Sequence, residues 1–202
     1  MIIKSIYLTA CGTNCYLLAD EETKLCAIID PGVADPRILE EVRSEGWTVG
    51  AILLTHGHYD HTRGIPALRP ELPGVPVYLH GGELDMKKPF FFIEEMGELT
   101  PMADGDHIKV GNLDVEVLHT PGHSAGSVTF KVEDTLITGD TLFKGSMGRT
   151  DLPGGGYEEM MASLKRLGEL SGDYKVLPGH MDASTLNFER ANNFYLREAM
   201  GN

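Results

Sequence analysis

The stretch of this chain that decides its fold is Thr55-His56-Gly57-His58-Tyr59-Asp60-His61. Residues 56–61 hold three imidazoles and one carboxylate, although the whole chain has only 8 His in 202 residues. Imidazole and carboxylate groups are the ligands that Zn²⁺, Fe and Mn use in proteins. The preceding residues 49–54 are apolar and have the length and β-branched composition of a buried strand. We therefore predict a metal site on a loop at the end of a strand, where functional residues collect; a polar loop that is merely rich in His is the alternative.

Three more candidate ligands lie further along the chain. His123, Asp140 and His180 each follow a short apolar run and a Gly. A Gly lets the backbone leave a strand sharply. We expect these strands to deliver the three side chains to one edge of a sheet.

This motif set, HxHxDH followed by a distant His, Asp and His, resembles the metallo-β-lactamase superfamily. Within it, the chain looks like a short, single-domain bacterial form of the glyoxalase II (hydroxyacylglutathione hydrolase) branch, from Asn14 to His180. The resemblance implies an α+β fold over residues 1–202, a four-layer αββα sandwich of two mixed β-sheets flanked by helices. It also implies two metal ions: the first held by His56, His58 and His123, the second by Asp60, His61 and His180, with Asp140 bridging both.

The expected chemistry is hydrolysis of a thioester, in a small acyl-thiol such as S-lactoylglutathione. Two divalent ions can share a hydroxide that attacks a carbonyl at neutral pH. Asp140 is expected to be catalytic as the bridging ligand, and Asp60 as a ligand that could also accept a proton or orient the water. The chain has no Gly-x-Ser-x-Gly nucleophile motif before a helix. Zn is the expected metal, and Fe or Mn suit the same ligand set.

Arg149 is the candidate substrate-binding residue. In glyoxalase II a basic residue at this place contacts the glutathione part of the substrate, whereas a bond from Arg149 to Asp151 or to backbone would instead shape the loop. The chain departs from glyoxalase II after His180, where Met181 follows in place of an aromatic hydroxyl region. It also ends after one expected helix, residues 183–200, so the thiol carrier need not be glutathione.

Other activities are compatible with the same residues. A sulfur (persulfide) dioxygenase would use one iron, held by His56, His58 and either Asp140 or His123. A lactonase or other carboxylic ester hydrolase would use the same two ions. A nuclease and a β-lactamase are disfavoured, the first because the chain is short and acidic and the second because no export signal is seen. A non-enzymatic metal-binding module is disfavoured because no ligand position is lost.

Composition limits the classes of binding partner and the cellular location that we expect for this protein. The net charge of −13 argues against binding to nucleic acid or to anionic membranes. The chain is 42% hydrophobic, enough for the core of one domain, and no run approaches the 18 apolar residues of a membrane span. We see no signal peptide and expect a cytoplasmic protein, monomeric or a small homo-oligomer. Cys11, Cys15 and Cys26 are expected to be reduced packing residues, with a Cys11–Cys15 redox pair as the alternative.

The remaining pattern predicts strands packed as two sheets with helices outside. Strands are expected at residues 2–8, 14–19, 25–30, 49–54, 75–80, 107–110, 113–118, 126–132, 134–138 and 174–177, and helices at 35–46, 157–170 and 183–200. Asp35-Pro36 has the form of a helix cap. Residues 81–105 are either a loop whose aromatics pack on the sheet or a flap that faces the substrate. Asp30 is expected to shape a turn, and His80 and His107 to lie at strand ends.

Overall fold

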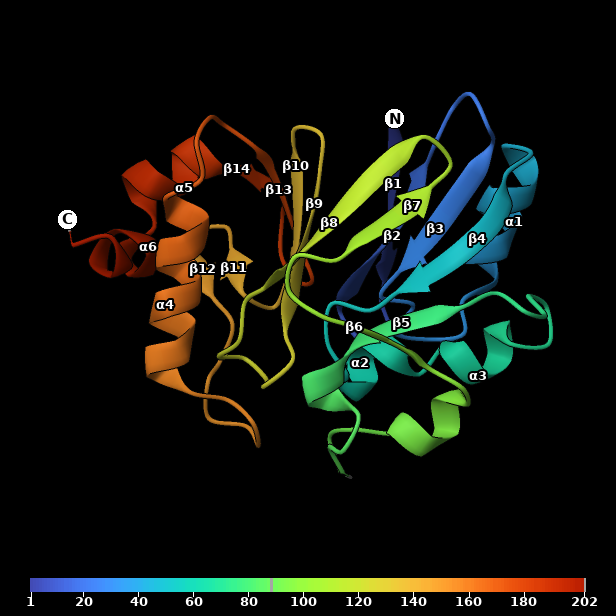
Figure 1. Ribbon diagram of the computed structural model, residues 1–202, viewed down its shortest axis with the longest axis horizontal. Coiled ribbons are helices and arrows are strands. Elements are labelled where there is room, and N and C mark those ends of the chain that lie inside the picture. Colours follow the sequence, from blue (N-terminus) through green and yellow to red (C-terminus); the bar gives the residue numbers. More distant parts are fainter. Residues whose placement is uncertain (88, 202) are drawn as a thin grey trace.

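Two sheets packed face to face form the centre of the molecule. The computed structural model describes residues 1–87 and 89–201, and Figure 1 shows these sheets between two groups of helices. The first sheet runs in chain order through β1 (Ile2–Leu8), β2 (Thr13–Ala19), β3 (Leu25–Ile29), β4 (Thr48–Leu53), β5 (Val77–His80) and β6 (Thr100–Met102). The second has the order β14 (Ser184–Thr185), β13 (Lys175–Pro178), β10 (Thr135–Gly139), β9 (Val128–Val132), β8 (Leu113–His119) and β7 (His107–Val110).

Helices cover the outer face of each sheet. The first sheet is flanked by α1 (Pro36–Ser44), α2 (Tyr59–Thr62) and α3 (Ile65–Leu68), and the second by α4 (Tyr157–Gly168), α5 (Leu186–Asn192) and α6 (Phe194–Ala199) (Figure 1). Two 3₁₀ turns, η1 (Gly81–Glu83) and η2 (Ile93–Met96), and a small ribbon of β11 (Leu142–Phe143) and β12 (Ser146–Met147) complete the described elements. The predicted four-layer αββα sandwich is confirmed.

Alternating side chains separate three apolar layers. Along β2, Leu17 packs toward the outer helices, whereas Leu18 packs toward the second sheet. The same alternation recurs in β4, where Ile52 and Leu53 join different layers. Successive residues of a strand point to opposite faces, so a strand buried on both faces is apolar throughout. This is why the central strands read as continuous apolar runs.

Parallel strand pairs bring the ends of several strands to one edge. In the first sheet β3 and β4 are parallel, and in the second sheet β10 and β13 are parallel. Strand β8 is antiparallel to β9, which is antiparallel to β10, so β8 ends at the same edge as β10. The loops that follow β4, β8, β10 and β13 therefore begin at strand ends that can lie at one edge of the sandwich, where their side chains can meet.

The predicted helix over residues 183–200 is wrong. That segment begins with strand β14 and continues as the two helices α5 and α6, which are separated at Asn193. Asn193 is fully buried and extended, with ψ 115°. Its side-chain oxygen accepts hydrogen bonds from the backbone N–H groups of Tyr195 and Leu196, which caps α6. An Asn side chain competes with helical backbone bonding in this way, and the apolar period of the sequence does not reveal the break.

Other expectations agree with the structure. Asp35 caps α1 by accepting a hydrogen bond from the backbone N–H of Arg37, and Pro36 begins the helix. Cys15 and Cys26 are buried in the core, as expected for packing residues. Within the described part of the chain, every helix is too short or too polar to cross a membrane.

Replacing Asn193 with Ala should destabilise the C-terminal layer. The side-chain amide of Asn193 also donates to the carbonyl oxygens of Phe143, at 3.2 Å, and Ser146, at 2.9 Å. Losing the cap and leaving these buried acceptors unpaired should lower the free energy of unfolding by about 2–4 kcal/mol, as measured by urea denaturation. The exposed neighbour Asn192 provides the control. An equal loss in Asn192→Ala would contradict this role for Asn193.

Candidate metal centre

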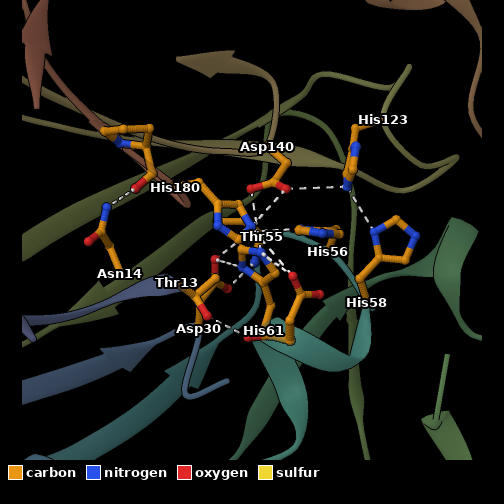
Figure 2. A network of polar contacts seen from close by, with 12 residues as sticks. Thr13, Asn14, Asp30, Thr55, His56, His58, His61, His123, Asp140 and His180 are labelled. Atoms are coloured by element: carbon orange, nitrogen blue, oxygen red, sulfur yellow. Dashed lines mark hydrogen bonds and ion pairs between the residues drawn. The ribbon is translucent and has the colours of Figure 1, made fainter. Parts of the chain in front are cut away.

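Seven side chains from both sheets meet at one edge of the sandwich. His56 and His58 lie on the loop after β4, and Asp60 and His61 lie in α2, which follows this loop. His123 comes from the loop between β8 and β9, Asp140 directly follows β10, and His180 lies two residues beyond β13. Figure 2 shows Asp140 among the imidazoles of this group, with His58 further out and joined to His123. We call these seven residues the His/Asp cluster: His56, His58, Asp60, His61, His123, Asp140 and His180.

The cluster contains three overlapping groups of possible metal ligands. In each group the candidate ligand atoms lie within 4.8 Å of one another, and the groups are His56–His58–His123, His56–His61–Asp140 and Asp60–His61–His180. The first and third groups share no residue. The cluster therefore offers two separate places for a metal ion, and the predicted sets of His and Asp are brought together as the sequence indicated.

Asp140 lies between these two places. Its Oδ1 is 3.4 Å from Nε2 of His61, and its Oδ2 is 3.4 Å from Nε2 of both His123 and His180. The carboxylate is almost fully buried. It therefore faces a nitrogen of the first group and nitrogens of the third, which is the position that a bridging ligand requires.

Unpaired polar atoms test whether the cluster fits metal ions. Among the described residues, five buried side-chain nitrogen or oxygen atoms have no hydrogen-bond partner, and four of them belong to the cluster: His56 Nε2, His58 Nε2, His61 Nε2 and Asp140 Oδ1. Buried polar groups are almost always paired, because an unpaired one costs about 1–3 kcal/mol. Metal ions would pair with three of these atoms: His56 Nε2, His61 Nε2 and Asp140 Oδ1. An ion held by Nδ1 of His58 and Nε2 of His123 would also separate these two nitrogens, which lie only 2.8 Å apart. The donor set therefore fits divalent metals.

Three cluster imidazoles are oriented by hydrogen bonds from their other nitrogen. Nδ1 of His61 lies 3.0 Å from Oδ2 of Asp30. Nδ1 of His123 donates to the carbonyl oxygen of Arg149 at 2.8 Å, and Nδ1 of His180 donates to that of Gly12 at 2.7 Å. Such bonds leave Nε2 free for a metal and fix the plane of the ring.

Sequence reasoning missed the role of Asp30, which was expected only to shape a turn. Asp30 is buried, with a φ of 52°, and it accepts hydrogen bonds from the backbone N–H and the hydroxyl of Thr55 as well as from His61. These partners lie 25 and 31 residues away in the chain. They meet because β3 and β4 are parallel neighbours that end at the same edge. No local signal reports that pairing.

Asn14 was likewise missed as a support for His180. Its side-chain amide donates to the carbonyl oxygens of Pro178, at 3.0 Å, and Met181, at 2.9 Å, on either side of His180. Its backbone N–H donates to the carbonyl of Gly179. Asn14 thus ties the loop after β13 to the first sheet.

Burial keeps part of the cluster neutral. Burial and the neighbouring imidazoles hold the pKa of His56 well below its usual value. Burial, followed by the proximity of His123, lowers the pKa of His58 to about 3. Neutral imidazole is the form that binds a metal, so His56 and His58 are in the metal-binding form at neutral pH.

In contrast to His56 and His58, the imidazoles of His61 and His180 carry protons when no metal is bound. Burial disfavours the charged form of His180, but hydrogen bonds to Asp140 and Asp60 outweigh it and raise its pKa to about 11. For His61, burial is likewise outweighed by the charge of Asp140 and the bond to Asp30, which raise the pKa to about 8. The same imidazoles hold the pKa of Asp140 below its usual value, against the effect of burial.

A cavity of about 350 Å³ opens onto the cluster. Its walls include Tyr59, Phe90, Phe143 and Leu152 together with five cluster residues. Arg149 also lines it, as predicted, but its guanidinium makes two 2.7 Å hydrogen bonds to the carboxylate of Asp151. The alternative of a bond to Asp151 is therefore present, and contact of Arg149 with a substrate stays a prediction.

Residues 81–105 combine the two structures that the sequence left open. Phe91 is buried and packs on the ring of His58, with ring centroids 4.6 Å apart, whereas Phe90 faces the cavity. Lys88, which contributed to the prediction of a flap, lies outside the described residues. His80 lies at the end of β5, as predicted, and its ring stacks on that of His119, with ring centroids 4.2 Å apart. Nε2 of His119 donates to the carbonyl of Ala125, in the loop that carries His123.

Comparison with known proteins agrees with this geometry. The pattern of the metallo-beta-lactamase superfamily matches residues 8–180. The chain belongs to this superfamily. It is 33% identical over 215 residues to "Hydroxyacylglutathione hydrolase GloC" of Haemophilus influenzae, covering 97% of this chain and 98% of that protein.

Solved structures of the superfamily share the fold closely. The crystal structure of the BLEG-1 B3 metallo-beta-lactamase has a TM-score of 0.84 and 31% identity, covering 96% of this chain and 99% of that one. The structure of TTHA1623 in a di-iron-bound form has a TM-score of 0.81 and 33% identity, covering 95% and 99%. This superfamily of metal-dependent hydrolases thus includes proteins of different names on one fold, and the present chain carries its cluster of His and Asp residues.

Binding of Zn²⁺ should displace protons from the cluster. At pH 7, His180 and His61 are both protonated, because their pKa values are about 11 and about 8. A metal must remove these protons from its ligands, so we expect at least about two protons per chain to be released at pH 7. At pH 9 His61 is already neutral while His180 is not, so about one fewer should be released.

Titration calorimetry in buffers of different ionisation enthalpy measures this release. A proton lost from bound water would appear at both pH values and would not change the difference. His107→Asn removes an exposed imidazole outside the cluster and should leave the count unchanged. Equal release at pH 7 and pH 9 would contradict the assigned charge of His61.

Proposed function

We propose that the protein is a thioester hydrolase that acts on a small acyl-thiol, as the hydroxyacylglutathione hydrolases do. The observation that carries the proposal is the position of Asp140 between two complete ligand groups. His56, His58 and His123 would hold one divalent ion, Asp60, His61 and His180 would hold a second, and Asp140 would serve both. Zn is the proposed metal, with Fe or Mn as alternatives, since the same N and O ligands accept all three.

Bound divalent ions would supply a water of lowered pKa and polarise the carbonyl of the substrate. The chain's own residues place these reactants. Asp60 lines the cavity and lies 3.4 Å from His180, so its carboxylate is positioned to accept a proton from the attacking water. Asp140 lies on the inner wall of the cavity and is almost fully buried, so bulk solvent has little access to its carboxylate.

The cavity accounts for the kind of substrate. Its volume is at the small end of the range for small-molecule sites. The rings of Tyr59, Phe90 and Phe143 provide apolar walls for a short acyl chain and the thioester sulfur. The carrier part of the thiol would lie across the open rim, where Arg149 is the nearest cation among the cavity residues.

The completeness of the second ligand group favours hydrolysis over the alternative of a sulfur dioxygenase. A reaction at a single iron would need only one group, whereas Asp60, His61 and His180 form another. A lactonase would use the same two ions, and only a comparison of substrates separates it from a thioesterase. The small-molecule partner, the cytoplasmic location and the monomeric or small oligomeric state stay predictions.

The first test is hydrolysis of S-lactoylglutathione by zinc-reconstituted protein, followed by loss of the thioester absorbance. We expect turnover that disappears on chelation and returns with metal. Asp140→Ala should lower kcat/KM by more than about a hundredfold, more than is usual for loss of an outer partner, while far-UV circular dichroism stays unchanged. Retained turnover in Asp140→Ala would refute the bridging role. No turnover by fully metallated wild-type protein would refute this substrate and leave lactones and other acyl-thiols to be compared.

Arg149 should govern recognition of an anionic carrier. Its partner Asp151 is largely exposed, and exposed ion pairs are weak, so a substrate carboxylate can replace it. We expect Asp151→Asn to lower KM for S-lactoylglutathione by about threefold and Arg149→Met to raise it by a similar factor, with kcat unchanged. An uncharged N-acetylcysteamine thioester serves as the control substrate. If both variants change KM equally for charged and uncharged thioesters, Arg149 does not bind the carrier.

A further inference from the structure

Glu83 is a fully buried carboxylate that lies outside the His/Asp cluster. It ends the 3₁₀ turn η1, which directly follows β5. Ionised carboxylates are almost never fully buried unless their oxygens are paired. Its partners therefore indicate what it does.

The two oxygens of Glu83 hold two different ligand loops. Oε2 accepts a hydrogen bond of 2.9 Å from the backbone N–H of Gly57, the residue between His56 and His58. Oε1 accepts one of 2.6 Å from the backbone N–H of Gly126, three residues after His123. The first loop leaves the first sheet and the second loop belongs to the second sheet. A single side chain thus links the two sheets at the point where the first ligand group is assembled.

The glycines on both loops are matched to this carboxylate. A Cβ atom at Gly57 would lie 2.8 Å from Oε2 of Glu83, and one at Gly126 would lie 2.5 Å from Cγ of Glu83. Both distances are under 3.0 Å, closer than a Cβ atom comes to any non-bonded atom in proteins. The backbone approaches Glu83 this closely only because neither position has a side chain.

We propose that Glu83 is a positioning residue that holds His56 and His58 at the correct separation from His123, so that the first metal subsite exists before the metal arrives. The proposal rests on the metal centre of the proposed function, but not on thioester hydrolysis. Glu83 touches no ligand atom and acts through the backbone of the two loops. Its loss should therefore weaken the first subsite selectively.

Zn²⁺ binding to the whole chain tests the proposal without any substrate. Glu83→Gln keeps the shape of the side chain but replaces one acceptor oxygen with an NH₂ group, which faces a backbone N–H. In competition with a chromophoric chelator, one of two Zn²⁺ equivalents should bind about 10–100-fold more weakly, as is usual when an outer partner of a metal site is lost. The other equivalent should change by less than about threefold.

Two further variants assign the effect. In a His180→Ala background, which leaves the first group intact, Glu83→Gln should weaken the remaining equivalent to the same extent. Glu189→Gln is the matched control, because Glu189 is also fully buried and accepts a 2.8 Å hydrogen bond from the backbone N–H of Gly145, away from both ligand loops. It should lower the melting temperature and leave both Zn²⁺ affinities unchanged.

The visible spectrum of the Co²⁺-substituted protein gives an independent measure of ligand geometry, and we expect it to change in Glu83→Gln but not in Glu189→Gln. Wild-type affinity for both ions in Glu83→Gln, or an equal loss at both, would overturn the proposal. If Glu83→Gln does not fold, Glu83→Asp takes its place, because the shorter side chain keeps the charge but cannot reach both loops. Glu83→Asp must then show the same selective loss, and its absence would equally overturn the proposal.

Discussion

The negative charge of Asp140 must be balanced inside the protein, and the arrangement of the site follows from that constraint. A buried carboxylate is costly unless positive charge or hydrogen bonds compensate it. Nitrogens of His61, His123 and His180 each lie 3.4 Å from its oxygens. Without metal, protons on His61 and His180 provide the balancing charge, and bound metal ions would take it over. Protons and metals therefore compete for the same atoms, which links folding, pH and metal content at one carboxylate.

The position of the cluster depends on how the two sheets pack. Each sheet contributes only part of a ligand group, since His56 and His58 leave the first sheet and His123 leaves the second. The apolar layer between the sheets, which includes Leu18, Leu53 and Phe130, sets their separation. Interiors packed at protein density transmit small shifts rather than absorbing them. Contacts that cross the sheets at the site, such as those of Asn14 and Glu83, therefore have more effect on the metal ligands than their distance from the metals suggests.

The fold alone does not select the reaction, because proteins named as a hydroxyacylglutathione hydrolase and as a B3 metallo-beta-lactamase are both similar to this chain. What distinguishes one protein from another lies in the loops around the metal edge. Here these loops supply the rings of Tyr59, Phe90 and Phe143 and one cation, Arg149, whose charge is already matched by Asp151. Under the proposed function, we expect an apolar acyl chain to occupy this cavity and the charged part of the thiol carrier to contact Arg149 at its rim.

Much of the protein could be predicted from its sequence. Ligand chemistry is local, so the spacing of the residues from His56 to His61 and the apolar runs before Asp140 and His180 were sufficient to predict a metal site at strand ends. The order of strand runs and helical patterns likewise predicted two sheets with helices outside, and the family resemblance implied the four-layer sandwich. Residues that act over long distances in the chain could not be predicted, because Asp30, Asn14 and Glu83 matter only through strand neighbours that the sequence does not report. The break at Asn193 was hidden partly for the same reason, since its side-chain amide donates to Phe143 and Ser146 in another loop while its oxygen caps α6. The sequence by itself thus determined which atoms can bind metal, whereas the tertiary structure decided how those atoms are held, because hydrogen bonds between distant segments form only after the two sheets have packed.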